Sequence, residues 1–461
     1  MRISLIFLAF FFSLATFAGI EQAPPSFFYN YQKIVWADFQ DAHYSLVYDI
    51  KKQKATATTT INFHLQEAGY PVFDNVTTPT KVYINGEETR QSLIPMPQNV
   101  TQARIVETYL EAGDHQLIIE SPISNGTRWN RVSQGPRHKK VVSVASGFFI
   151  KDLTDRLFLE KYVPSNYEYD QYKMTFDVKI LNSKVSHNVF ANGDVTELAK
   201  NHIRIEYPQW YGSSSVFFHL VPKSRFVRYY LTYPSIDGRQ IPIIIYSAFR
   251  FFNKMLKDRA FEVLAELEND YGPWPHPQVL IYGNNIRGGM EYPGATATSL
   301  VSLGHELQHS YFAKGLVPAN GNSGWMDEAI ASWRDKGHQT HELPFFSHSN
   351  IGGQSIYKRN TDKRSYEYGR SFMAYVDYRL KEIGKAGLKD FLRQYFEKRK
   401  FTTVTTEDFR SDLEEYAQMS FELDFDQYIY GQSIEKNNVH SHYHENPHHP
   451  QLTIEELESL I

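Results

Sequence analysis

The sequence of 461 residues contains no cysteine. This absence excludes disulfide bonds, thiolate metal sites, a cysteine nucleophile and a lipid attached to an N-terminal cysteine. An excess of charge of one sign is also absent, because 48 basic residues stand against 52 acidic ones. A broad basic face that binds nucleic acid is therefore not expected.

Long hydrophobic runs are absent after the first twenty residues. Met1 and Arg2 precede an uncharged apolar segment, residues 3–20, with small residues such as Ala18 near its end. This order is typical of a secretory signal peptide. We expect residues 1–18 to be cleaved and the protein to be exported, periplasmic or secreted, with no membrane span in its mature form. The alternative is a retained signal anchor, since about 18 apolar residues can just cross a bilayer.

The sequence as a whole has the composition of a folded protein, with 42% hydrophobic and 22% charged residues. Its length predicts at least two domains, because single cores rarely grow beyond about 250–300 residues. Residues 19–243 are predicted to form an antiparallel β-sheet domain, saddle-like or sandwich-like. Alternation of apolar and polar residues, as at Ile61, Phe63 and Leu65, indicates its strands. Two pairs between apolar runs predict hairpin turns: Asn192-Gly193 and Asp237-Gly238.

Residues 244–433 are predicted to form a second, mostly helical α+β domain. Helical spacing of apolar residues predicts helices at 299–314, 325–336, 366–382, 386–399 and 406–417. Residues 434–461 contain a histidine-rich tract that is interpreted as a floppy tail rather than a built metal site.

The most informative motif is His305-Glu306-Leu307-Gln308-His309, which has the pattern H-E-x-x-H within a predicted helix. Residues four apart lie on one face of a helix, so both imidazoles can reach one ion. A catalytic zinc ion uses three protein ligands and an open position, and two histidines with a carboxylate are a common set. Glu328, on the next predicted helix and separated from His309 by eighteen residues, is the candidate third ligand of one Zn²⁺ ion.

These residues resemble the aminopeptidase N family of gluzincin zinc metallopeptidases. That family has H-E-x-x-H, eighteen residues and Glu, preceded by a G-x-M-E-N segment. Residues 288–293 match that segment, although Tyr292 stands where Asn is common. The family's Trp-Leu-Asn-Glu segment is similar to residues 325–332, and its Tyr-x-Lys-Gly motif to residues 366–369, with Tyr368 in place of Lys. The resemblance implies a thermolysin-like catalytic domain that hydrolyses peptides from their N-terminus.

The resemblance also implies roles for individual residues. Glu306 is expected to act as general base towards a metal-activated water, and the family assigns stabilisation of the oxyanion to Tyr366. Tyr368 is a rival, because two residues apart on a helix point in different directions. Glu291 is expected to bind the α-amine of the substrate. The implied substrate-binding segment consists of Gly288, Gly289, Met290 and Glu291.

Several points stay open in the sequence. The family's second amine-binding side chain comes from the β domain, and a rough alignment leaves Asp155 and Glu160 as candidates. The chain ends soon after the catalytic segment, so the large C-terminal helical domain of many members is expected to be missing. The alternatives to an aminopeptidase are a zinc endopeptidase or oligopeptidase that requires no free amine, and a non-catalytic, metal-stabilised peptide-binding module. The expected partners are peptide substrates, and the oligomeric state stays unknown.

Overall fold

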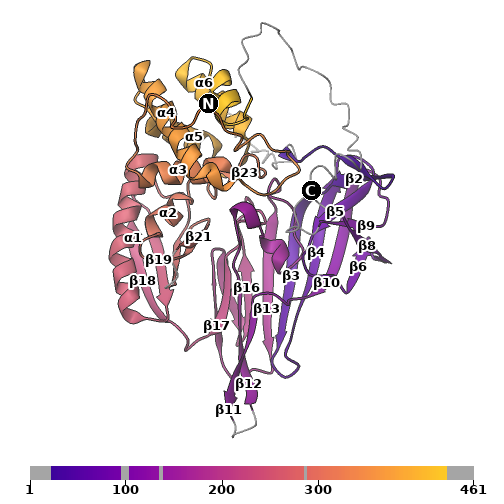
Figure 1. Cartoon of the computed structure of the whole chain (residues 1–461). Helices are drawn as coiled ribbons and strands as arrows, with labels where there is room; N and C mark the ends of the chain where they lie inside the picture. The colour runs from indigo at the N-terminus through magenta and orange to yellow at the C-terminus, as the bar shows by residue number, and fades with distance from the viewer. Residues whose placement is uncertain (1–21, 95–102, 134–138, 285–287, 433–461) are drawn as a thin grey trace, which may run out of the picture.

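The computed structural model describes residues 22–94, 103–133, 139–284 and 288–432. Within these ranges, β-sheets dominate the first half of the chain and helices dominate the last part (Figure 1). The predicted signal peptide, residues 1–18, and the histidine-rich tail, residues 434–461, lie outside the described residues. None of the helices in the described ranges combines the length and the apolar character needed to cross a bilayer.

The N-terminal part contains three sheets, which Figure 1 shows in indigo to magenta. The eight-stranded sheet has the order β15 (Asp194–Ala199), β16 (His202–Glu206), β13 (Lys173–Leu181), β3 (Asp38–Asp49), β4 (Lys54–Leu65), β10 (Gly113–Pro122), β6 (Lys81–Ile84) and β7 (Glu87–Thr89). The five-stranded sheet has the order β1 (Phe27–Tyr29), β2 (Gln32–Trp36), β5 (Tyr70–Asp74), β9 (Ala103–Val106) and β8 (Gln91–Leu93). The four-stranded sheet has the order β11 (Thr127–Ser133), β12 (Lys139–Phe148), β17 (Phe218–Pro222) and β14 (His187–Ala191).

The predicted alternation accounts for these strands. In β4, the side chains of Ile61, Phe63 and Leu65 are buried, while those between them are partly exposed. One face of the strand therefore packs into a core shared with residues of the four-stranded sheet, such as Phe148 and Phe218.

Of the two predicted hairpin turns, one is confirmed and one is wrong. Asp237-Gly238 joins β18 (Val227–Pro234) to its antiparallel partner β19 (Gln240–Ser247), and Gly238 has a φ of 87°. Asn192-Gly193 instead connects β14 to β15, which belong to different sheets. The Asn192 amide is buried and donates hydrogen bonds to the carbonyl oxygens of Ser215 and Pro293, at 2.8 and 3.0 Å. These long-range hydrogen bonds fix the segment in which the chain passes from one sheet to the other.

The second part of the chain is built on a five-stranded sheet with the order β18 (Val227–Pro234), β19 (Gln240–Ser247), β20 (Val279–Gly283), β22 (Ala295–Thr298) and β21 (Gly289–Tyr292). Its helices are α1 (Arg250–Tyr271), α2 (Leu303–Gln308), α3 (Trp325–Asp335), α4 (Glu367–Glu382), α5 (Leu388–Arg399), α6 (Thr406–Ala417) and α7 (Glu422–Tyr428). Short strands β23 (Val317–Pro318) and β24 (Thr403–Val404) pair in parallel. The predicted domain boundary at 243/244 falls inside β19, and the sheet that contains β19 begins with β18.

Four of the predicted helices correspond to α3, α4, α5 and α6. The predicted helix at 299–314 is wrong in length, because α2 covers only Leu303–Gln308. The N–H groups of Ser310 and Tyr311 bond to carbonyl oxygens three residues earlier rather than four, which tightens the chain into turns. Ala313 then has a φ of 102°, and the chain folds back so closely that a Cβ on Gly315 would lie 2.5 Å from the Ser310 carbonyl oxygen.

A buried cluster of charged residues joins the two parts of the molecule. Arg359, in the chain between α3 and α4, is buried and donates to Glu168 Oε2 at 3.0 Å. Its guanidinium also contacts Asp74 and lies 3.6 Å from Glu160 Oε1. Arg156 donates to the Arg359 carbonyl oxygen at 2.9 Å. The segment that leads into α4 is therefore fixed against the N-terminal sheets by ion pairs shielded from water.

We expect Arg359→Met to lower the free energy of unfolding by about 3–5 kcal/mol, because it leaves buried carboxylates without their cation. Urea unfolding measures this change. The matched control is Arg364→Met, since Arg364 pairs with Asp362 near the surface, where loss of an ion pair costs about 0–1 kcal/mol. Equal losses in the two variants would show that the buried cluster does not hold the parts together.

Candidate metal and active centre

The three predicted metal ligands lie together. His305 lies in α2, His309 directly follows the last residue of that helix, and Glu328 lies in the first turn of α3. The Nε2 atoms of His305 and His309 lie 3.2 and 3.8 Å from the same Glu328 oxygen, Oε2. Ligand atoms of all three residues lie within 4.8 Å of one another.

The other ring nitrogen of each histidine faces an aspartate. His305 Nδ1 lies 2.8 Å from Asp335 Oδ2, and His309 Nδ1 contacts Asp327. Such partners fix the ring orientation and turn Nε2 towards a metal ion. Neither aspartate was predicted to be a site residue, although both lie on α3 with Glu328. Asp335 is seven residues after Glu328, a helical spacing that places both carboxylates on one face and could have indicated it.

The environment of the two imidazoles favours a bound cation. Burial opposes a charged His305, but Asp335 and Glu328 outweigh it and raise its pKa to about 10. Burial likewise opposes a charged His309, whose pKa is nonetheless well above its usual value, chiefly because of Asp327. Nε2 of His309 is buried and has no hydrogen-bond partner in the described part of the chain. Two imidazole nitrogens and a carboxylate oxygen fit a zinc ion.

Glu306 lies beside this ligand set. Its carboxylate is buried and is within 4.8 Å of ligand atoms of His309 and Glu291. Burial raises the pKa of Glu306 to about 7, against the opposing charges of His309 and His305. A Cβ on Gly289 would lie 2.5 Å from the Glu306 carboxylate. The glycine therefore makes room for Glu306 as well as for an approaching substrate.

Glu291 belongs to β21, the terminal strand of its sheet, next to α2 in space (Figure 1). The strand begins at Gly289, and Gly288 before it has a φ of 93°. Met290 is partly buried against aromatic residues. A terminal strand of this kind can pair with an extended peptide. Burial raises the pKa of the Glu291 carboxyl well above its usual value, with Lys314 as the main opposing charge.

Two further charged residues adjoin Glu291, and neither was predicted. Asp152, just before a short 3₁₀ turn (Leu153–Asp155), has a carboxylate oxygen within 4.8 Å of those of Glu291 and Asp327. Lys314 is 2% exposed, and its Nζ lies 3.5 Å from Glu291 Oε1 and 3.8 Å from Asp152 Oδ2. Lys314 is placed here by the tight turn after α2. The packing of that turn against distant parts of the chain determines its shape, and no local spacing in the sequence indicates it.

Of the two predicted candidates for a second amine-binding residue, the structure describes the side chain of Glu160 alone. Glu160 is buried beside Arg359, and its Oε1 accepts a hydrogen bond from the Phe158 N–H at 2.8 Å. The side chain of Asp155 lies outside the described part of the molecule. Within the described residues, Asp152, three residues before Asp155, is an acidic side chain of the N-terminal part that lies beside Glu291.

The two candidate tyrosines point to different surroundings. The Tyr366 ring lies 6.3 Å from the His305 ring, centroid to centroid, and the charge of Glu328 acts on the Tyr366 hydroxyl. Burial, followed by the charge of Glu328, raises the pKa of Tyr366, so the hydroxyl keeps its proton. Tyr368 stacks on Phe346 at 4.4 Å. Of the two, Tyr366 is the one at the ligand set.

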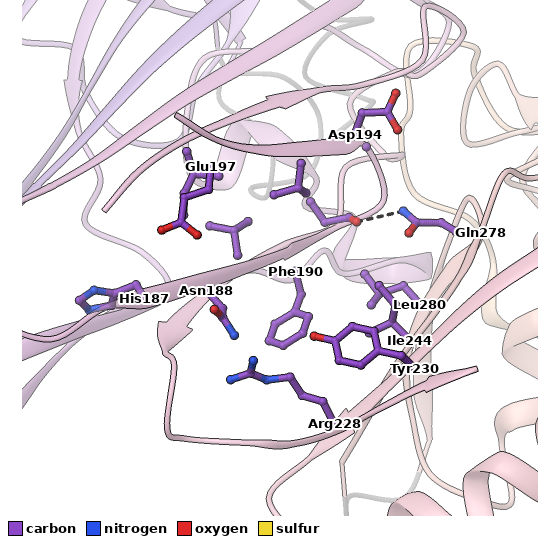
Figure 2. A pocket seen from close by; sticks show the side chains of 15 residues that line it. His187, Asn188, Phe190, Asp194, Glu197, Arg228, Tyr230, Ile244, Gln278 and Leu280 are labelled. Atoms are coloured by element: carbon purple, nitrogen blue, oxygen red, sulfur yellow. Dashed lines mark hydrogen bonds between the residues drawn. The ribbon is translucent and has the colours of Figure 1, made fainter. Parts of the chain in front are cut away.

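A separate cavity lies between the two parts of the molecule. Its volume is about 360 Å³, and it is lined by residues of β14, β15, β18 and β20. Figure 2 shows Arg228 and Tyr230 near Phe190, and Gln278 hydrogen-bonded to the Ala191 carbonyl oxygen at 3.1 Å. None of the predicted site residues lines this cavity.

Comparison with known proteins identifies the fold. No family model matches the chain, and no curated protein is similar to it in sequence. Among solved structures, the M1 zinc metallopeptidase from Deinococcus radiodurans is similar over 90% of this chain and 99% of its own, with 16% identity and a TM-score of 0.61. Leukotriene A4 hydrolase from Saccharomyces cerevisiae is similar over 87% of this chain and 69% of its own, with 14% identity and a TM-score of 0.62. The chain has the β-rich and helical two-part fold of these proteins.

We expect Asp327→Asn to lower zinc affinity by about 10–100-fold, because the partner that orients His309 is weakened. Competition with a zinc-chelating dye measures the affinity. Asp258→Asn, at an exposed position of α1, is the control and should bind zinc as the wild type does. Unchanged affinity in Asp327→Asn would mean that this carboxylate does not support the ligand set.

Proposed function

We propose that the protein is an exported, zinc-dependent aminopeptidase that removes N-terminal residues from peptides. The arrangement around Glu328 carries the proposal: two imidazole Nε2 atoms face one carboxylate oxygen, and an aspartate holds each Nδ1. The similarity of fold to M1 zinc metallopeptidases supports it. So does a Deinococcus variant of that enzyme, solved in complex with a Tyr-Ser-Ala substrate and similar over 87% of this chain with 15% identity and a TM-score of 0.59.

In this proposal His305, His309 and Glu328 hold one zinc ion. When bound, zinc polarises the scissile carbonyl and lowers the pKa of the attacking water. Glu306 takes the proton of that water and passes it to the nitrogen of the leaving amine. Its buried carboxylate adjoins His309 without forming part of the ligand set, which suits it to this transfer.

Tyr366 is assigned to the oxyanion. As water adds to the carbonyl carbon, negative charge develops on the carbonyl oxygen, and a fixed hydroxyl donor lowers the energy of that state. The Tyr366 hydroxyl keeps its proton and lies beside Glu328, so it is placed to donate.

The substrate is proposed to pair with β21 and to place its α-ammonium against Glu291, with Asp152 as the second carboxylate. Strand addition aligns the peptide backbone, and the ammonium contact fixes the cut after the first residue. An endopeptidase or oligopeptidase that needs no free amine is the second candidate. It is favoured by one observation, which is that Lys314 already contacts Glu291.

Glu306→Gln should lower kcat by about 10²–10⁴-fold and still bind zinc, because it removes the proton acceptor and leaves the ligands intact. Mass spectrometry of a mixed peptide pool, each peptide present with a free and with an acetylated N-terminus, measures cleavage by wild type and variant. Zinc content of both proteins is measured alongside.

Stepwise loss of single residues, faster from the free peptides and absent in Glu306→Gln, is the expected result. Internal cleavage of both forms at equal rates would instead identify an endopeptidase. Full activity of Glu306→Gln, or its loss of zinc, would contradict the assigned roles.

Tyr366→Phe should lower kcat by about 10²–10³-fold with little change in KM, because only the donor to the developing charge is lost. Tyr368→Phe is the matched control and should be close to wild type, since its ring stacks on Phe346. Steady-state kinetics on one peptide compares the two, and a larger effect in Tyr368→Phe would reverse the assignment.

A further inference from the structure

The two carboxylates assigned to the substrate's α-ammonium, Asp152 and Glu291, already have cations of the protein beside them. Asp152 Oδ1 accepts a hydrogen bond from Arg156 Nε at 2.9 Å. This leaves Glu291, whose Oε1 lies 3.5 Å from Lys314 Nζ. A substrate ammonium that binds Glu291 therefore meets a carboxylate whose charge is already compensated.

The fold inserts Lys314 into this position. The Lys314 N–H bonds to the His309 carbonyl oxygen at 2.8 Å, immediately after α2 ends. The close approach of Gly315 to the Ser310 carbonyl oxygen holds the turn. With only 2% of its surface exposed, the Lys314 side chain is confined to the site. Its Nζ also lies 3.8 Å from Asp152 Oδ2, an oxygen without a hydrogen-bond partner in the described part of the chain.

We propose that Lys314 is a specificity-determining residue: its ammonium competes with the α-ammonium of the substrate for Glu291 and Asp152. This rests on the proposed function and refines it. Two cations near one carboxylate repel each other, most strongly where water is excluded. The free N-terminus therefore contributes less to binding than Glu291 alone would provide, and peptides with a blocked N-terminus are less disfavoured.

The test compares kcat/KM for one peptide with a free and with an acetylated N-terminus. In Lys314→Met, the ratio of free to acetylated should rise at least tenfold, through a lower KM for the free peptide. Lys314→Arg keeps a cation and should keep the wild-type ratio. Lys254→Met, which removes a cation from an exposed position of α1, is the matched control and should also keep that ratio.

An unchanged or lower ratio in folded, zinc-loaded Lys314→Met would overturn the proposal. If Lys314→Met does not fold, Lys314→Gln serves in its place, because its amide can still donate to Glu291. A measurement that needs no turnover keeps this test separate from the proposed function. In the Glu306→Gln background, calorimetry gives the Kd of the free and acetylated peptides with and without Lys314→Met.

Tenfold tighter binding of the free peptide alone, on loss of Lys314, supports the competition even if no peptide is hydrolysed. If the free peptide does not bind more tightly, the proposed competition is contradicted, whether or not the protein hydrolyses peptides. Failure of the wild type to cleave any peptide, in contrast, refutes the proposed function.

Discussion

Carboxylates that are buried close together must be compensated by cations, and this requirement determines the arrangement of the candidate site. Glu291, Glu306, Asp327 and Glu328 are all buried where α2, α3 and the strand β21 meet. An unpaired buried charge costs on the order of several kcal/mol. Lys314 supplies part of the compensation at Glu291, and Nε2 of both histidines faces the Glu328 carboxylate. In the proposed function, a divalent cation completes the balance of charge.

The same constraint explains how distant segments reach the centre. The chain between α3 and α4 delivers Tyr366, and Arg359 fixes that chain to carboxylates of the N-terminal sheets. Arg156 bonds both to Asp152, beside Glu291, and to the Arg359 carbonyl oxygen. The ion pairs that join the two parts of the molecule are thus continuous with those that surround the proposed substrate-binding carboxylates.

The local sequence pattern was sufficient to predict the site residues that lie on helices. The spacing of His305 and His309 on one helical face, and the acidic first turn of α3, predicted a group that the structure does bring together. Only the structure shows which of Tyr366 and Tyr368 lies at the ligand set, because the surroundings of each ring depend on tertiary packing. Residues placed by long-range contacts were not predictable in this way. Lys314 reaches Glu291 through a turn that ends α2 early, and Asp152 comes from the other part of the molecule.

One zinc ion is proposed to occupy the position between His305, His309 and Glu328. Anomalous diffraction at the zinc absorption edge, from crystals of the protein grown with zinc, would locate this ion. We expect one strong peak about 2.0–2.2 Å from Nε2 of both histidines and from a Glu328 oxygen. A peak among Asp152, Glu291 and Asp327 instead, or no peak at the three predicted ligands, would contradict this proposal.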